Sequence, residues 1–295
     1  MIPRSYLFVP ADSEKKLAKG ADSGADALLL DLEDAVAAVR KPVAREMARA
    51  YLDARPLPRQ QEVWIRINDL HSGFALDDLA AVVGGKPDGL MIPKTNSGAD
   101  VTLISHYLDI LEVRDGVPPG HIKLMVVSTE TAEAIFNLGT YKGSSKRLTG
   151  LSWGAEDLAT SLGASSNKGP DGLLLPIYQL ARALCVAGAQ TAGVTAYDTA
   201  FINFRDPEGL KATMAAARRD GYRGALAIHP DQVPVINEAF TPSEAEVAWS
   251  QRVVDAFNAE PGAGVVGLDG KMLDRPHQRQ AEAVLALYQS IKARG

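Results

Sequence analysis

Residues 122–130 read Ile122-Lys-Leu-Met-Val-Val-Ser-Thr-Glu130, and residues 148–157 read Leu148-Thr-Gly-Leu-Ser-Trp-Gly-Ala-Glu-Asp157. In each stretch a short apolar run, typical of a buried parallel strand, is followed by an acid. If the two runs are adjacent parallel strands, Glu130 and Asp157 emerge at the same rim of the sheet. Two carboxylates at one rim, with coordination positions left for water and substrate, indicate a catalytic Mg²⁺ site.

Further apolar runs precede and follow these two along the chain, and amphipathic helical patterns separate them. The expected strands are Tyr6–Val9, Ala27–Leu32, Val63–Ile67, Gly89–Ile92, Lys123–Ser128, Leu148–Trp153, Thr191–Ala196 and Gly224–Ile228. The expected helices are Glu14–Ala21, Pro42–Asp53, Leu76–Val83, Val101–Val113, Thr131–Leu138, Ile177–Ala187, Pro207–Asp220 and Gln232–Ala239. Eight such units in about 240 residues predict an α/β fold of the (β/α)₈ (TIM) barrel type. A doubly wound sheet is the main competitor, but no Gly-rich nucleotide motif follows the first strand.

The carboxyl ends of the expected strands carry an unusual number of chemically active residues. They are Pro10, the stretch Asp31-Leu-Glu-Asp34, Arg66, Asn68, Pro93-Lys94, Glu130, Glu156-Asp157, Asp198 and His229. In a barrel these ends form one ring around the mouth, where active sites of this fold are built. The sequence therefore predicts a site at this mouth.

The chain beyond the barrel has a different pattern, so we expect a barrel over residues 1–240 and a C-terminal segment over residues 241–295. Ser243 with Glu246 three residues later forms a helix-start signal, and the helix should run to about Ala259. A Gly-rich stretch, Pro261–Gly270, and a final helix through Lys292 follow. This pattern is typical of a helical lid, or flap, that also contacts a neighbouring subunit.

Composition excludes several classes of function. The chain has 295 residues, 46% of them hydrophobic, and a formal net charge of −5, which argues against a nucleic-acid partner. Its single cysteine, Cys185, excludes an internal disulfide and a multi-thiolate metal site, and its apolar surroundings indicate buried packing. With no secretory signal and no membrane-spanning run, we expect no membrane partner and a cytoplasmic location.

Taken together, several short stretches resemble the citrate lyase β-subunit-like family, which includes malyl-CoA and citramalyl-CoA lyases and belongs to the HpcH/HpaI aldolase group. The matching stretches are Arg4–Pro10, Leu30–Val36 with Lys41 and Ala44-Arg45, Ile65–Asn68, Ile92–Lys94, Thr129–Ala132, Gly154–Leu158, Ile228–Gln232, Phe240–Pro242 and Gly270–Asp274. Each stretch is weak alone, but the order and spacing are specific, and they cover nearly the whole chain.

The resemblance implies a Mg²⁺-dependent carbon–carbon lyase that cleaves or forms a 3-hydroxyacyl-CoA thioester. Its products would be an acyl-CoA and a 2-oxo acid such as oxaloacetate, pyruvate or glyoxylate. By the same resemblance Glu130 and Asp157 hold the metal, Glu130 also lies beside the substrate, and Arg66 binds the oxo-acid carboxylate. Asp274 would be the acid/base residue, lent to the site of a neighbouring subunit in a homotrimer or a pair of trimers.

The residues leave several alternatives open. The planar fork of Arg66 suits a carboxylate ligand, but the same side chain could form an ion pair with Asp31 or Glu33. Those two acids could serve as outer-shell partners of the metal site. His229 could be a base or a structural histidine.

At the level of function, a metal-dependent aldolase acting on free 4-hydroxy-2-oxo acids and a non-catalytic acyl-CoA-binding protein remain competitors. Family members often carry a Gly-Lys pair where this chain has Gly224-Ala225. The sequence leaves open which acyl group and oxo acid are used, in which direction, and whether the thioester is CoA or carrier-bound.

Overall fold

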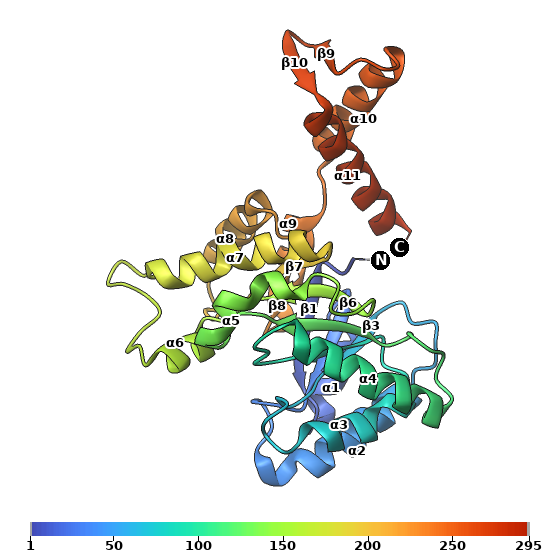
Figure 1. Ribbon diagram of the computed structural model, residues 1–295, viewed down its shortest axis with the longest axis vertical. Coiled ribbons are helices and arrows are strands. Elements are labelled where there is room, and N and C mark those ends of the chain that lie inside the picture. The colour runs from blue at the N-terminus through green and yellow to red at the C-terminus, as the bar shows by residue number, and fades with distance from the viewer. Residues whose placement is uncertain (1, 294–295) are drawn as a thin grey trace. The chain divides into compact units, whose positions relative to one another are not determined.

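The computed structural model describes residues 2–293, which form two compact units. Residues 3–237 make up the barrel unit, and residues 238–293, with Ile2, make up the C-terminal unit. Figure 1 shows the barrel unit in blue through yellow to light orange and the C-terminal unit in darker orange to red.

Eight parallel strands close into a barrel in the order of the sequence, which confirms the expected fold. The strands are β1 (Ser5–Pro10), β2 (Ala27–Asp31), β3 (Glu62–Arg66), β4 (Gly89–Ile92), β5 (Lys123–Val127), β6 (Leu148–Ser152), β7 (Thr195–Asp198) and β8 (Gly224–Ala227). The barrel closes where β1 pairs with β8, with Ser5 opposite Ala225.

Helices follow the strands, and those that begin after Ser97, Thr131 and Asp206 are capped by the side chains of these residues. The α-helices are α1 (Glu14–Ala21), α2 (Lys41–Asp53), α3 (Ala75–Val82), α4 (Gly98–Asp115), α5 (Ala132–Asn137), α6 (Glu156–Leu162), α7 (Pro176–Ala192), α8 (Pro207–Asp220) and α9 (Val233–Phe240). Short 3₁₀ helices span Ala38–Arg40, Val83–Gly85, Leu138–Tyr141 and Pro230–Gln232. Among residues 2–293, none of the helices is long and apolar enough to cross a membrane.

The seventh strand lies later than the sequence pattern predicts. The pattern predicts a strand over Thr191–Ala196, but α7 runs on to Ala192 and ends at Gly193, which adopts a left-handed φ of 71°. The alanines and Gln190 shortly before Gly193 favour helix, and a left-handed glycine is a common helix terminator. The strand is therefore Thr195–Asp198.

The interior of the barrel is filled by large side chains that alternate with glycines. Tyr6 packs edge-on against Trp64 and Tyr197, with ring centroids 5.4 and 5.0 Å apart. A Cβ on Gly89 would lie 2.3 Å from the Trp64 ring, and one on Gly150 would lie 2.7 Å from Tyr197. Since real Cβ atoms do not approach so closely, the aromatic core requires glycine at both positions.

A β-bulge interrupts the pairing of β5 with β6, the two strands that lead to Glu130 and Asp157. Leu124 pairs with Leu148, but the next residue, Met125, pairs with Gly150 rather than Thr149. The extra residue, Thr149, hydrogen-bonds through its side chain to the Leu124 carbonyl over 3.2 Å. Beyond the bulge the register is regular and ends with Val127 opposite Ser152.

The C-terminal unit contains α10 (Glu244–Ala259), a hairpin of β9 (Val265–Leu268) and β10 (Lys271–Asp274), and α11 (Arg275–Lys292). Ser243 and Glu246 form the expected capping box of α10. The hairpin was not expected, because its strands are only four residues each and lie in a Gly-rich stretch. A small core seals the unit, formed by Val253, Phe257, Val266, Leu273 and Ala281.

Candidate active site

Charged side chains gather at the carboxyl ends of β2 to β6, as the sequence predicts for the barrel mouth. We call the following set the mouth cluster: Asp31, Glu33, Arg66, Lys94, Glu130 and Asp157. Short contacts link its members to one another. All six lie among the strand-end residues that the sequence predicts for the mouth, although Lys94 was given no specific role in the site.

Arg66 and Asp31 meet because the barrel places them side by side. They are the last paired residues of β3 and β2, directly opposite in the register. Arg66 donates through Nε and Nη2 to the two Asp31 oxygens, over 2.8 and 2.7 Å. Its Nη1 lies 2.8 Å from Glu33 Oε2.

The ion-pair alternative for Arg66 is therefore present in the structure. Although burial works in the opposite direction, the adjacent Asp31 carboxylate raises the pKa of Arg66 above its ordinary value. Hydrogen bonds to Asp31 occupy two of the five guanidinium N–H groups, whereas Nη1 faces Glu33 Oε2 as an ion pair without hydrogen-bond geometry.

Glu130 is the most deeply buried acid at the mouth whose carboxylate is free to act as a ligand. Its side chain is 5% exposed, and its Oε2 accepts a 2.6 Å hydrogen bond from the Lys94 main-chain N–H. Within residues 2–293 this is its only hydrogen bond, so Oε1 is left for another partner. Burial raises the pKa of Glu130 to about 8.

Gly154 makes room for Glu130. A Cβ at position 154 would lie 2.9 Å from the Glu130 Cγ. The glycine of the stretch 148–157 thus lets the next loop pass directly beside the buried carboxylate.

Asp157 lies in the first turn of α6, and its side chain is 35% exposed. Its Oδ1 is 3.4 Å from Lys94 Nζ, and its charge is close enough to help raise the pKa of Glu130. No cluster of three or more metal-ligating side chains occurs within residues 2–293. Asp157 and Glu130 thus influence each other electrostatically at the mouth, and a pair of carboxylates suits Mg²⁺ because this ion usually keeps waters and substrate oxygens as its other ligands.

Lys94 connects the acids of the cluster, a role that the sequence did not reveal. Its Nζ lies 2.5 Å from Glu33 Oε1 and 3.5 Å from Asp34 Oδ2. Despite burial, the hydrogen bond to Glu33 raises the pKa of Lys94, and burial in turn raises the pKa of Glu33. Lys94 also has a left-handed backbone, with φ of 51°. No sequence pattern signals this conformation for a lysine.

Asp274, the expected acid/base residue, lies in the C-terminal unit and caps α11. It is exposed, and its Oδ1 is 2.5 Å from His277 Nδ1. The hydrogen bond with His277 lowers the pKa of Asp274, the opposite of what burial under a closed lid would do.

Two other predicted mouth residues have structural roles here. Asn68 is buried and bonds to Asp78 and Lys41, so it fastens β3 to the flanking helices. His229 accepts a hydrogen bond from the Asp231 N–H at the start of a 3₁₀ helix and stacks on Phe204.

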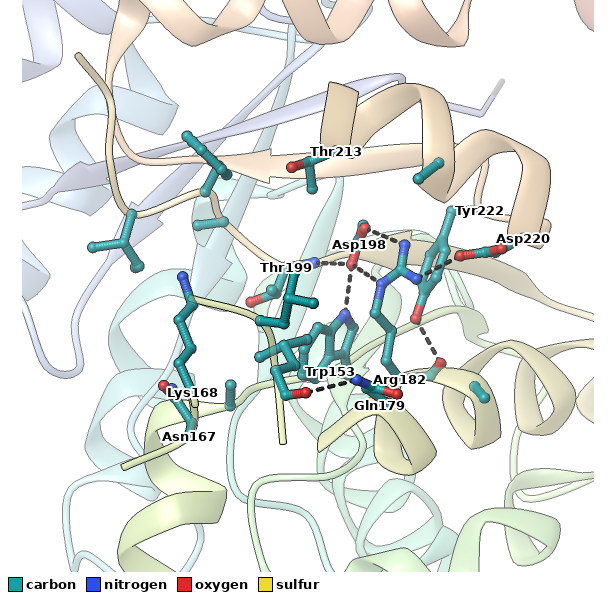
Figure 2. Close-up of a pocket in the computed structure, with 18 of the residues that line it drawn as sticks. Trp153, Asn167, Lys168, Gln179, Arg182, Asp198, Thr199, Thr213, Asp220 and Tyr222 are labelled. Atoms are coloured by element: carbon teal, nitrogen blue, oxygen red, sulfur yellow. Dashed lines mark hydrogen bonds and ion pairs between the residues drawn. The ribbon is translucent and has the colours of Figure 1, made fainter. Parts of the chain in front are cut away.

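A cavity of about 890 Å³ lies beside the mouth cluster and includes none of its members. It is bounded by the β6–α6 connection, the loop after α6, and helices α7 and α8. Figure 2 shows Arg182 in its floor, bonded to Asp198 and Asp220, with Trp153 donating its indole N–H to Asp198 over 2.6 Å.

Cys185 is fully buried, and burial raises the pKa of its thiol to about 12, which confirms the packing interpretation.

Comparison with known proteins gives relatives along the whole chain. A (3S)-malyl-CoA thioesterase of Cereibacter sphaeroides is 34% identical over 294 residues, covering 99% of this chain and 96% of the relative. A citrate lyase subunit beta of Haemophilus influenzae is 34% identical, covering 96% of this chain and 95% of the relative.

Solved structures of similar proteins match the same chain. The CitE protein of Mycobacterium tuberculosis, in complex with magnesium, acetoacetate and coenzyme A, superimposes with a TM-score of 0.78. It is 31% identical, and the match covers 97% of this chain and 98% of that one. RipC from Yersinia pestis matches with a TM-score of 0.66 at 29% identity, over 83% of this chain and 97% of that one. The HpcH/HpaI aldolase/citrate lyase family model matches residues 4–230, and the chain belongs to this family.

Proposed function

We propose that the protein is a Mg²⁺-dependent carbon–carbon lyase that cleaves, or forms, a 3-hydroxyacyl-CoA thioester. The products of cleavage are an acyl-CoA and a 2-oxo acid such as oxaloacetate, pyruvate or glyoxylate. The observation that carries the proposal is the buried Glu130 carboxylate, with one free oxygen, beside Asp157 at the barrel mouth. The magnesium and coenzyme A bound by the tuberculosis CitE support it.

Glu130 and Asp157 would hold the Mg²⁺. When bound, this ion supplies Lewis acidity that polarises the oxygen atoms of the oxo-acid portion. Arg66 would bind the carboxylate of that portion through N–H groups that Asp31 does not occupy, while Asp31 and Glu33 fix the orientation of the guanidinium. This orientation is set before substrate arrives, which lowers the entropic cost of binding.

Cleavage moves one proton off the substrate hydroxyl and one proton onto the acyl carbon. As the carbon–carbon bond breaks, its electron pair passes to the thioester, forming an enolate. Asp274 is proposed to exchange the proton at the acyl carbon of that enolate. It can do so efficiently only when it loses water, because desolvation raises a carboxyl pKa towards the working pH.

Binding of Mg²⁺ is expected to release close to one proton at about pH 6.5. Glu130 has a pKa of about 8 without metal, so it is protonated at this pH and must ionise to act as a ligand. Apparent affinity should rise roughly tenfold per pH unit below pH 8 and level off above it. Titration calorimetry in buffers of different ionisation enthalpy counts the proton. Release of no proton at the lower pH would contradict the assignment of Glu130.

The proposal for Asp274 includes an oligomer, a homotrimer or a pair of trimers, in which each C-terminal unit serves a neighbouring barrel. Mixed oligomers of Asp274→Asn and Glu130→Ala subunits, each inactive alone, should regain part of the activity. The regained fraction follows the statistics of subunit mixing, since some sites then combine an intact Glu130 from one subunit with an intact Asp274 from its neighbour. Confirmed mixed oligomers without activity would show that each chain uses its own Asp274.

A second candidate is hydrolysis of the thioester, which the name of the Cereibacter sphaeroides relative favours. One assay separates the reactions. On malyl-CoA or citramalyl-CoA, a lyase yields a 2-oxo acid and an acyl-CoA without free thiol, whereas a thioesterase yields free CoA thiol. Turnover of free 4-hydroxy-2-oxo acids alone would indicate an aldolase. Tight thioester binding without turnover, unaffected by Glu130→Ala, would indicate a non-catalytic protein.

A further inference from the structure

The main chain at Lys94 has a conformation that L side chains rarely adopt. Among residues 2–293, the non-glycine residues with positive φ are Lys86, Lys94 and Asp269, at 56°, 51° and 51°. Lys86 ends a 3₁₀ helix, and Asp269 lies in the turn between β9 and β10. Lys94 instead lies two residues after the end of β4, at the barrel mouth. Strained backbone of this kind persists where the surroundings determine it, and it concentrates at functional sites.

The left-handed turn aims one N–H group at Glu130. The pairing of β4 with β5 ends with Ile92 opposite Val126. Pro93 has no N–H to donate, so the next donor along the chain is that of Lys94. It lies 2.6 Å from Glu130 Oε2 and is the carboxylate's only hydrogen-bond partner within residues 2–293.

The side chain of the same residue is tied to the other acids. Its ammonium lies 2.5 Å from Glu33 Oε1 and 3.4 Å from Asp157 Oδ1. Glu33 is buried and also contacts Arg66, so it is a fixed anchor. Lys94 is therefore held at both ends, by its ammonium on one side and its N–H on the other.

We propose that Lys94 is the positioning residue of the metal site: its left-handed main chain directs one N–H to Glu130 Oε2 and thereby orients the free oxygen of Glu130. The inference rests on the proposed function, in which Glu130 is a metal ligand. The geometry separates two contributions of one residue, the charge and the main-chain direction. Lys94→Gly removes the charge but still permits the left-handed main chain. Lys94→Val removes the charge and also disfavours the left-handed main chain, because a β-branched side chain resists positive φ.

The test is the dissociation constant of Mn²⁺, used as the spectroscopic probe and measured by electron paramagnetic resonance, for Lys94→Gly and Lys94→Val. We expect Lys94→Gly to stay within about threefold of wild type, and Lys94→Val to bind roughly 10- to 100-fold more weakly, the usual effect of losing an outer-shell partner. A purely ionic role predicts equal losses in the two variants. Equal values, whether both weakened or both retained, would overturn the proposal.

Lys86 supplies a matched control, since it has the same left-handed backbone and no member of the mouth cluster among its contacts. Lys86→Val should lower the melting temperature as any strained substitution does, yet leave the Mn²⁺ dissociation constant of wild type. A weakening as large as that of Lys94→Val would show that strain alone is being measured. If Lys94→Val does not fold, Lys94→Ala replaces it in the comparison with Gly.

Hydrogen exchange gives a readout that does not depend on metal. The Lys94 amide of the wild type should exchange more slowly than in Glu130→Ala, which lacks the acceptor. Equal exchange rates would overturn the positioning contact itself. If the wild type binds no Mn²⁺ while the Lys94 amide is protected by Glu130, the proposed metal site fails and the positioning geometry stands.

Discussion

Glu130→Gln is expected to lower kcat/KM by roughly 10³-fold or more. Lewis-acid stabilisation is worth several kcal/mol, and each 1.36 kcal/mol corresponds to a factor of ten in rate. The amide oxygen of Gln can still accept the Lys94 N–H but is a weak ligand for Mg²⁺. Because the change removes a buried ionisable group, the folded protein should be at least as stable as the wild type.

The measurement combines steady-state kinetics with Mg²⁺ titration and thermal unfolding. Glu156→Gln is the control, since Glu156 is exposed, lies next to Asp157 and bonds to Asn167. Its effect on rate should stay within about threefold. A Glu130→Gln variant with normal activity, or one that binds Mg²⁺ as the wild type does, would refute the two-carboxylate site.

Arg66→Met is expected to destabilise the protein by about 3–5 kcal/mol, the usual cost of removing one partner of a buried charge pair. The side chain of Arg66 is 12% exposed, and its removal leaves the Asp31 carboxylate, 1% exposed, without its partner. Catalysis should fail as well, because the proposed grip on the oxo acid is lost. Arg66→Lys keeps the charge but lacks the planar fork, so its stability and activity should fall between those of the wild type and Arg66→Met.

Urea unfolding at neutral pH measures the loss. Arg49→Met is the control, because Arg49 pairs with Asp53 on the surface of α2, where both side chains are about half exposed. Removing that pair should change the free energy of unfolding by no more than about 0.5 kcal/mol. An equally small loss for Arg66→Met would contradict the prediction and would mean that other groups of the mouth cluster compensate the charges of Asp31 and Glu33.

The sequence predicted the barrel because each strand is a short apolar run and each carboxyl end carries reactive side chains. Parallel pairing then brings the residues that follow neighbouring strands to one rim, so Glu130 and Asp157 could be predicted to lie together. The pairing of Asp31 with Arg66 was open from the sequence as one of two alternatives. It follows from register, which a single sequence does not specify.

What the sequence could not predict depends on backbone detail. Nothing in Ile92-Pro93-Lys94 signals that Lys94 adopts positive φ, because lysine has no preference for that region. The shift of β7 followed from Gly193, whose role as a helix end could be read only once α7 was known to continue that far. The cavity floor of Asp198 and Arg182 joins residues sixteen positions apart through side-chain geometry alone.

The bulge at Thr149 decides which set of β6 side chains enters the barrel lumen. Leu148 is paired with Leu124, whose side chain points out of the barrel. If every residue after Leu148 were paired in turn, regular alternation would point the side chains of Leu151 and Trp153 into the barrel. Because Thr149 is left unpaired in the bulge, the alternation shifts by one residue, and the small residues Gly150, Ser152 and Gly154 face inward instead. Deleting Thr149 would remove the bulge and leave Leu148 and Gly150 opposite Leu124 and Met125, so Gly150 and Ser152 would still face the barrel interior. The bulge therefore accommodates one additional residue in β6 while the small side chains stay opposite Met125 and Val127.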